Sequence, residues 1–386
     1  MLPEDGPEPL AAIAGAFDLP GAVESVAPLG SGNVNDTFLV VSRGGDGEVS
    51  GGPRSRFVLQ RLNQRVFPRP DLVMANILAV GEHVERRLGR AAPLLAGRRW
   101  ELPRVVRARR DQRPWVIHGD DFWRMLTFVE TSRSFDVVAG GAQAWEVGHG
   151  LGLFHHLISD LPPARLADTL EGFHITPTYL AHYDAVLVGA GAASGNGVDH
   201  CRAFVEQRRS FAPVLEQAKA DGLLLPRPIH GDPKVNNVML DVDTGRAVAL
   251  VDLDTVKPGL IHYDIGDCLR SCCNPAGEES SDLDAVRFDL DLCRDVLGGY
   301  LAAASGFLTE ADYDHLLAAI RLISFELGLR FFTDHLAGDV YFRVDHPGHN
   351  LQRALVQFRL TESIEAQAAQ IAGLIEELRA HPPAPR

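Results

Sequence analysis

The spacing of hydrophobic and polar positions changes near residue 130 of this chain. Before residue 127, apolar residues fall in short alternating runs typical of strands, at 22–29, 38–41, 56–62, 102–107, 114–117 and 122–128. In this part only residues 71–88, which follow Pro70, have helical spacing. Beyond residue 140 helical spacing predominates, and it predicts helices at 142–157, 177–188, 202–218, 283–304, 310–332 and 350–378.

This pattern predicts an α+β protein with two unequal lobes. We place a small β-rich lobe at residues 1–127, a connector at 128–139 and a large helical lobe at 140–386. Glycines and polar residues at 44–53 cannot form a buried strand, so we expect a disordered loop there. A Gly/Ala/Ser cluster at 189–197 separates two of the predicted helices.

Composition narrows the class of protein. The chain has 386 residues, 46% of them hydrophobic, but no apolar run approaches the length of a membrane span. Its acidic N-terminus does not resemble a signal peptide, and five cysteines show no metal-site spacing, so we expect a cytoplasmic enzyme with reduced thiols. The net charge of −14 disfavours nucleic acid and anionic membranes as partners. A small-molecule partner is favoured.

The candidate chemistry lies in residues 229–237, Ile-His-Gly-Asp-Pro-Lys-Val-Asn-Asn, and in Val-Asp-Leu-Asp at 251–254. Kinase-type active sites use an Asp in a His-x-Asp loop, an Asn five residues later and a second Asp at the end of a strand. Asp232, Asn237 and Asp252 occupy these three places. The spacing therefore predicts phosphoryl transfer in a protein-kinase-like two-lobe fold.

Each of these residues has a predicted role. Asp232 would accept a hydrogen bond from the attacking hydroxyl and take its proton late, because an ordinary carboxylate is a weak base. Asn237 and Asp252 would supply oxygen ligands to Mg²⁺. Lys234 would balance charge on the transferring phosphoryl group.

The chain contains a second copy of the tetrapeptide Ile-His-Gly-Asp, at residues 117–120. The residue five positions after Asp120 is Met125 rather than Asn, and an apolar strand follows directly. We interpret this copy as a turn, which shows that the tetrapeptide alone is weak evidence of function.

A glycine-rich segment separates the first two predicted strands. Gly30 and Gly32, with Ser31 between them, could bring backbone amides close to phosphate oxygens without obstruction by Cβ atoms. No Gly-Lys-Ser/Thr follows, so this is not a Walker loop. We predict a nucleotide-binding glycine loop here.

The chain resembles the aminoglycoside phosphotransferase and choline kinase family, and within it bacterial N-acetylhexosamine 1-kinases. Three blocks carry the closer resemblance: residues 30–38, residues 230–267 and the segment Gly-Leu-Arg-Phe-Phe-Thr-Asp-His-Leu-Ala-Gly-Asp-Val-Tyr-Phe at 328–342. The resemblance spans residues 20 to 370 and implies that ATP and a free sugar react, with Mg²⁺, to give a sugar 1-phosphate and ADP.

The resemblance also implies a set of contacts. Asp232 would face the anomeric hydroxyl, and Arg330 and Tyr341 would line the sugar pocket, although a salt bridge and a core aromatic are the structural alternatives. Further acceptor-site candidates are Asn33, Asp254 and Arg270, although Asp254 could instead be a carboxylate that supports the residues around the site, and Arg270 could form a structural salt bridge. The adenine would lie against the connector at Phe128, Val129 and Glu130.

Several positions depart from the family pattern. Gln60 stands on the third strand where kinases place a Lys for the α- and β-phosphates, and Arg61 lies on the opposite strand face. Glu82 or Glu85 on the first long helix then lacks its usual Lys partner. Asn33 and Ser271 stand where sugar 1-kinases tend to have a His and an aromatic residue. Gln60 could still donate a hydrogen bond to phosphate.

These departures keep two alternatives open. The acceptor could be another hydroxylated metabolite or an aminoglycoside, or the protein could be a nucleotide-binding pseudokinase. Among the remaining polar residues, we expect Asp264 and Asp267 to brace the catalytic loop through backbone hydrogen bonds. We expect His155 and His156 to serve packing.

Overall fold

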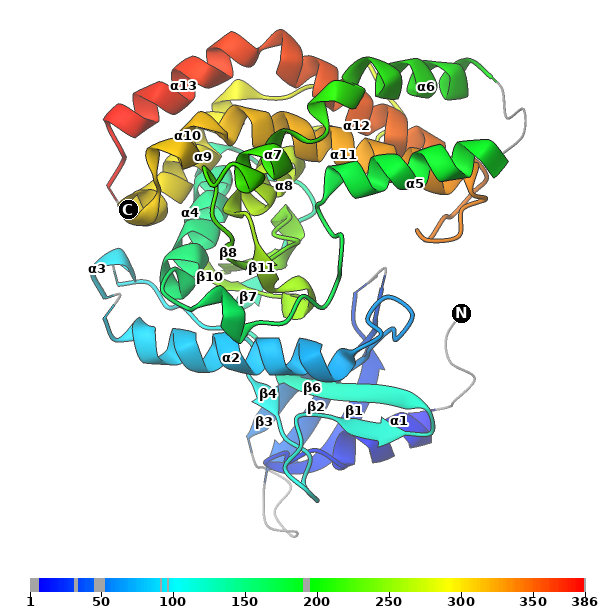
Figure 1. The fold of residues 1–386 in the computed structure, drawn as a ribbon. Coiled ribbons are helices and arrows are strands. Elements are labelled where there is room, and N and C mark those ends of the chain that lie inside the picture. Colours follow the sequence, from blue (N-terminus) through cyan, green and yellow to red (C-terminus); the bar gives the residue numbers. More distant parts are fainter. Residues whose placement is uncertain are drawn as a thin grey trace.

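The computed structural model describes residues 7–30, 34–44, 53–90, 92–95, 97–189 and 195–384, arranged as a β-rich part and a helical part (Figure 1). The predicted two-lobe division is confirmed. The predicted loop at 44–53 and the cluster at 189–197 lie largely outside the described residues. Within the described residues, no helix is both long enough and apolar enough to cross a membrane.

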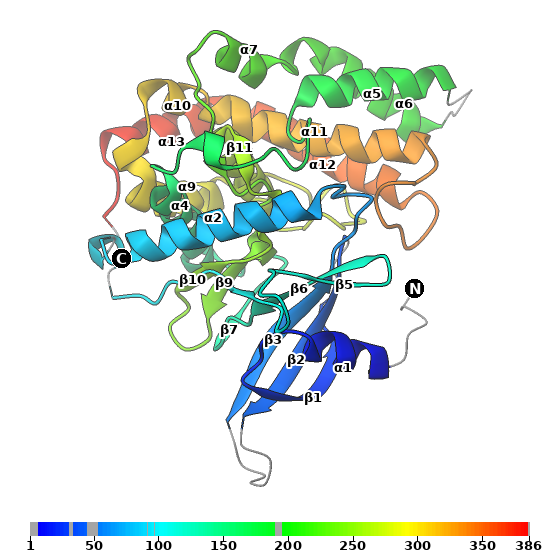
Figure 2. The same ribbon diagram turned by 60° about the horizontal axis from the view of Figure 1, so that its bottom comes forward.

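The β-rich part is an antiparallel sheet of six strands in the order β1-β2-β3-β6-β4, with β5 paired to β6. Its strands are β1 (Gly21–Pro28), β2 (Asp36–Gly44), β3 (Arg54–Arg61), β4 (Val105–Val106), β5 (Val116–His118) and β6 (Asp121–Thr127). Helix α1 (Pro7–Gly15) covers one face (Figure 2). There Phe17 packs into a small core with Leu59 and Trp123.

Helix α2 (Pro70–Leu88) lies between the sheet and the helical part (Figure 1). Its apolar residues, such as Met74 and Ile77, belong to the large core of the helical part. The buried side chain of Asn76 donates to the carbonyls of Ala167 and Val256, each at 2.8 Å. This helix is therefore fixed to the helical part rather than to the sheet.

In the helical part, α4 packs closely against α9 at the centre. An added Cβ at Gly148 would lie 1.9 Å from the carbonyl oxygen of Val296, so the approach requires glycine. The helices are α3 (Ala92–Leu95), α4 (Gly141–Ile158), α5 (Thr176–Gly189), α6 (Asn196–Arg208), α7 (Val214–Ala220), α8 (Ile261–Cys272), α9 (Leu290–Ala304), α10 (Glu310–Asp314), α11 (Leu316–Leu336), α12 (His349–Ala366) and α13 (Ala368–Ala380).

Two small sheets lie between α4 and the β-rich part. One pairs β8 (Arg227–Ile229) with β11 (Lys257–Gly259), and the other has the order β10-β9-β7, from Ala247–Leu250, Val238–Asp241 and Ser132–Arg133. The connector thus contributes β7 to the helical part. These short strands position the candidate catalytic residues.

Four predicted helices need correction. The helix at 202–218 ends at Arg208, and a new one begins after Pro213, which cannot continue a helix. The helix at 283–304 begins only at Leu290, where the Asp289 carboxylate accepts from the amides of Asp291 and Leu292. The helices at 310–332 and 350–378 are each interrupted where the backbone leaves the helical region, at His315 and Gln367.

Three helices, α1, α3 and α8, were not predicted. Of the strand predicted at 102–107, only Val105 and Val106 pair with a neighbour. The first copy of Ile-His-Gly-Asp forms the β5–β6 hairpin turn with Gly119 at φ +60°, which confirms its interpretation as a turn.

Candidate active site

The second Ile-His-Gly-Asp copy follows β8 and turns sharply at Gly231, where φ is +90°. A Cβ on this residue would lie 2.6 Å from the carbonyl oxygen of Thr255. Both the backbone angle and the close approach therefore require glycine. The turn directs Asp232 away from β8 and leaves its side chain 29% exposed.

A buried carboxylate braces this loop, as predicted for Asp264. Its oxygens accept from the amides of His230 (2.6 Å) and Gly231 (2.8 Å), and from Nε2 of His155 (2.8 Å). Burial alone raises the pKa of Asp264, but the hydrogen bond and charge of His155 and the His230 amide outweigh it, so the pKa lies below its ordinary value. His155 is thus a packing and bracing residue.

The prediction that Asp267 also braces the loop is wrong. Its Oδ1 accepts from Nε of Arg270 at 2.8 Å, because both residues lie on α8, a helix that the sequence did not predict. The Oδ2 atom of Asp267 is buried without a partner among the described residues.

His174 holds the same loop from the opposite side. Its Nε2 lies 2.7 Å from the Gly231 carbonyl oxygen, and its Nδ1 lies 2.9 Å from a carboxylate oxygen of Glu326. Desolvation lowers the pKa of His174, but the charge and hydrogen bond of Glu326 outweigh it and raise the pKa above its ordinary value. An imidazolium that donates from both nitrogens fits this position. No motif in the sequence indicated this residue.

Hydrogen bonds join the catalytic loop to the segment that follows β10 and carries Asp252. His230 donates from Nε2 to the Val251 carbonyl (3.0 Å), and the Val251 amide donates to the carbonyl of Asn237 (2.9 Å). Asp252 itself has a left-handed backbone, with φ +63° and ψ +56°. Such a conformation in a residue other than glycine is typical of functional sites.

The structure brings Asp232, Lys234, Asn237 and Asp252 into one site. The Asn237 amide donates to the carbonyl (2.7 Å) and carboxylate (3.3 Å) of Asp232, and Lys234 Nζ lies 3.1 Å from Asp232 Oδ2. The charge of Asp232 is the largest cause that raises the pKa of Lys234, so this amine stays cationic.

Asp252 carries an unfavourable charge in the absence of a cation. Desolvation, followed by the charges of Asp254 and Asp232, raises its pKa to about 7, although its side chain still reaches solvent. A divalent cation would relieve this repulsion, and carboxylate and amide oxygens are the ligands that Mg²⁺ prefers. Asp252 and Asn237 therefore fit a Mg²⁺ ion, which would neutralise charge on the phosphates of the nucleotide.

The predicted nucleotide site is described in part. Gly30 follows β1 with φ +70°, whereas Ser31, Gly32 and Asn33 lie outside the described residues. In the connector, Val129 forms a small apolar cluster with Met239, Val248, Ala249 and Val251. The Phe128 ring lies under the guanidinium of Arg56, which also pairs with Glu130. An adenine contact there remains a prediction.

Gln60 is already engaged by protein partners. Its amide oxygen accepts from Nε (2.9 Å) and Nη2 (2.7 Å) of Arg124, and its amide nitrogen donates to Oγ1 of Thr37 (3.1 Å). Arg124 also forms an ion pair with Asp254, whose other oxygen accepts from the Asn35 side chain at 2.7 Å. The arrangement ties Asp254 to the β-rich part, so the structure gives no support to its predicted role as an acceptor contact.

Arg330 and Tyr341 line one pocket of about 370 Å³. The Arg330 guanidinium lies 5.0 to 5.4 Å from the ring centres of Phe173, Tyr179 and Phe342. Desolvation lowers the pKa of Arg330, but nearby oxygens, including the carboxylate of Asp232, outweigh it and raise the pKa. Phe173, which lines the pocket, directly precedes His174, whose Nε2 lies 2.7 Å from the Gly231 carbonyl oxygen, so the pocket lies beside the loop that carries Asp232.

The loop that carries Tyr341 is held by one side chain. The carboxylate of Asp334 accepts from the amides of Val340 (3.0 Å), Tyr341 (2.8 Å) and Phe342 (2.9 Å). Its oxygens are therefore occupied, and Asp334 offers little free negative charge to a ligand in the pocket.

Arg270 does not share the cavity of Arg330 and Tyr341. It lines a larger hollow of about 720 Å³ on the side of Lys234 and Ser271, and it pairs with Asp267 and Glu278. The predicted acceptor residues thus divide between two cavities, one with Arg330 and Tyr341 and the other with Arg270.

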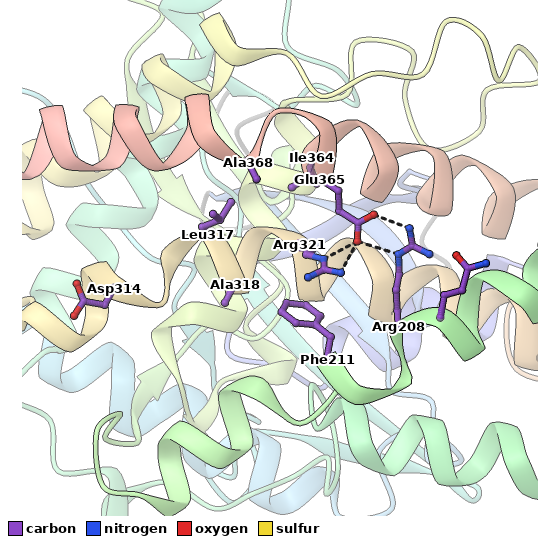
Figure 3. Close-up of a pocket in the computed structure, with 10 residues that line it drawn as sticks. Arg208, Phe211, Asp314, Leu317, Ala318, Arg321, Ile364, Glu365 and Ala368 are labelled. Atoms are coloured by element: carbon purple, nitrogen blue, oxygen red, sulfur yellow. Dashed lines mark hydrogen bonds and ion pairs between the residues drawn. The ribbon is translucent and has the colours of Figure 1, made fainter.

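A third hollow, of about 540 Å³, contains none of the predicted site residues (Figure 3). Arg208 and Arg321 both pair there with Glu365. Because both guanidinium groups are engaged by the Glu365 carboxylate and no predicted site residue lies there, we assign the hollow no role.

The fold and the site together define a phosphotransferase of the kinase type. The chain belongs to the phosphotransferase enzyme family, whose pattern it matches over residues 25–300. Solved structures agree on the fold. An aminoglycoside phosphotransferase from Alicyclobacillus acidocaldarius gives a TM-score of 0.58 at 15% identity, over 95% of this chain and 96% of that one.

Two further structures widen the comparison. A spectinomycin phosphotransferase, in complex with ADP and spectinomycin, gives a TM-score of 0.55 at 8% identity, over 97% of this chain and all of that one (100%). A choline kinase from Cryptosporidium parvum gives 0.52 at 12% identity, over 93% of each chain. At these identities the likeness shows the fold, and it confirms the predicted kinase-like architecture.

Proposed function

We propose that this protein transfers the γ-phosphoryl group of ATP, with Mg²⁺, to the anomeric hydroxyl of a hexosamine-type sugar such as N-acetylglucosamine or N-acetylgalactosamine. Asp232 accepts the hydrogen bond of the attacking hydroxyl and Lys234 balances negative charge on the phosphoryl group in flight. Asn237 and Asp252 hold the metal ion.

The observation that carries this proposal is the composition of the pocket near Asp232. Its volume of about 370 Å³ suits a small ligand, and aromatic rings of Phe173, Tyr179 and Tyr341 suit the apolar faces of a sugar. The Arg330 guanidinium offers donors to hydroxyl or acetamido oxygens. A polyamine would bring like charge to Arg330, so the pocket favours a neutral acceptor.

An aminoglycoside acceptor is a second candidate because of the larger hollow beside Lys234. Four acidic residues, Asp136, Glu278, Glu279 and Asp345, line it. Glu278 and Glu279 are already paired with arginines, which weakens this candidate.

The test is Mg²⁺-dependent ADP release from ATP with N-acetylglucosamine, N-acetylgalactosamine, glucosamine, galactose and kanamycin. Turnover with an N-acetylhexosamine, with ³¹P NMR placing the phosphate on the anomeric oxygen, would support the proposal. The Asp232→Asn variant should lose this turnover. Asp120→Asn, at the same place in the exposed hairpin copy of the motif, is the matched control and should retain it.

Other outcomes of this assay would favour a different function. Turnover with kanamycin alone would favour the second candidate. ATP binding without turnover across the whole panel would contradict a kinase function and favour a pseudokinase.

A further inference from the structure

The cation that kinases place at the nucleotide phosphates is missing from its usual strand. That cation is a Lys on the third strand, which pairs the α- and β-phosphates. Here Gln60 holds the position, and the strand register pairs it directly with Arg124 on β6. Directly opposed residues of two strands present their side chains on the same face of the sheet. A guanidinium therefore stands beside the vacant Lys position.

Gln60 acts as the holder of this guanidinium. Its amide oxygen accepts two hydrogen bonds from Arg124, and its amide nitrogen is fixed by Thr37. With its oxygen held by Arg124 and its nitrogen by Thr37, the amide is fixed in orientation, and only the second N–H of its NH₂ group is left for a ligand. Arg124 keeps its Nη1 edge directed away from Gln60, toward Asp254.

The surroundings of Arg124 are those of the predicted nucleotide site. Asp254, its ion-pair partner, lies two residues after the metal ligand Asp252 and also binds Asn35 from the glycine-loop stem. Only 1% of the Arg124 side chain and 3% of the Asp254 side chain are exposed. The guanidinium thus lies between the third strand, the glycine-loop stem and the metal-binding segment.

We propose that Arg124, oriented by Gln60, supplies the positive charge for the α- and β-phosphates of the nucleotide, and that Asp254 pairs with it when no nucleotide is bound. The inference rests on the proposed function as an ATP-dependent kinase. A planar guanidinium can donate two parallel hydrogen bonds to phosphate oxygens, which an ammonium cannot do. The competing interpretation is that the pair of Arg124 and Asp254 only joins the two lobes.

The test measures nucleotide binding without any acceptor. Calorimetry gives the Kd of ADP with Mg²⁺, and that of adenosine, for the unmodified protein and for Arg124→Met. We expect ADP binding to weaken about 10- to 100-fold, as for loss of charged hydrogen bonds, while adenosine binding changes less than about twofold. An equal loss for both ligands, or no loss for either, would overturn the inference.

Two further variants sharpen the test. The double variant Gln60→Lys/Arg124→Met returns an ammonium to the third strand and should recover much of the ADP affinity; no recovery, with a native melting temperature, would contradict the inference. Arg61→Met is the matched control, because Arg61 lies next to Gln60 in β3 but pairs with Asp36 and Asp121. It should leave both affinities unchanged.

If Arg124→Met does not fold, Arg124→Lys keeps the charge and removes the planar fork. It should weaken ADP binding alone, and equal effects on ADP and adenosine would again overturn the inference. Failure of the unmodified protein to bind either ligand would instead contradict the proposed function itself. The wrong choice of acceptor sugar affects none of these measurements.

Discussion

The replacement Asp264→Asn should destabilise the protein and misplace the catalytic loop. Asp264 is fully buried and accepts from two backbone amides and one imidazole. An asparagine has one acceptor oxygen, and its NH₂ group would face an N–H donor of His155, His230 or Gly231. Two of the three bonds go to one oxygen, so asparagine can keep at most those two, as uncharged bonds of about half the strength, and it loses the third. A charged hydrogen bond is worth about 1.5–3 kcal/mol. The expected loss in free energy of unfolding is therefore about 3–6 kcal/mol.

The stability that the Asp264 carboxylate contributes to the fold depends on pH in a definite direction. Because the folded-state pKa of Asp264 lies below its ordinary value, the carboxylate stabilises the fold above about pH 4, its pKa in the unfolded chain. The contribution disappears as the pH falls through the lower, folded-state pKa. At pH 7 the difference between Asp264→Asn and the unmodified protein should be at its full value.

Denaturant unfolding at pH 7 measures the stability, and turnover under saturating ATP and sugar measures the effect on the loop. Asp289→Asn is the matched control, because Asn caps a helix N-terminus as well as Asp. It should change the free energy of unfolding by less than about 0.5 kcal/mol. If Asp264→Asn matched this control in both stability and kcat, the bracing role of Asp264 would be refuted.

Three further outcomes are expected. Lys234→Met should lower kcat about 100-fold with little change in the acceptor KM, since its amine pairs with Asp232 and would balance charge on the phosphoryl group of our proposal. An unchanged kcat in steady-state kinetics would contradict this. Gly231→Ala should lower the melting temperature far more than Gly119→Ala, where a Cβ meets no atom within 4 Å; equal shifts would refute the close-approach argument. His174→Gln should reduce the melting temperature most below about pH 6.5. The raised folded-state pKa of His174 gives stability that is lost as the pH rises through that pKa. A constant difference in melting temperature between variant and unmodified protein from about pH 5.5 to 8.5 would refute an imidazolium there.

The candidate catalytic residues could be placed together from the sequence because their positions along the chain are close. Asp232 and Asn237 lie within one turn, and Asp252 follows after a single short hairpin, so spacing along the chain translates directly into proximity. The same tetrapeptide at 117–120 lies in a hairpin of the sheet, where no Asn follows. The context after the tetrapeptide, and not the tetrapeptide itself, identified the site.

Helix ends and the bracing residues were less predictable because they depend on distant partners. His174 reaches Gly231 and Glu326 across more than fifty residues of sequence, and no local pattern indicates such a contact. Helix α8 was missed although Ile261, Ile265, Leu269 and Cys272 are spaced as an apolar stripe, because polar residues such as Asp264 and Asp267 stand between them. The polar residues favoured the interpretation as a turn, which obscured the helical pattern.

The missing third-strand Lys shows that a motif alone does not reveal which residue lies opposite it on the neighbouring strand. The sequence shows that Gln60 carries no charge, but Arg124 lies 64 positions later and looks like an ordinary member of an alternating strand. Only the pairing of β3 with β6 places its guanidinium on Gln60. If a nucleotide displaces Asp254 from this guanidinium, Arg124 on β6 provides the positive charge at the phosphates. The amide of Gln60 on β3 then holds the guanidinium in place. A kinase site can then tolerate loss of its strand-three Lys, provided that the residue in its place can orient a cation from the next strand.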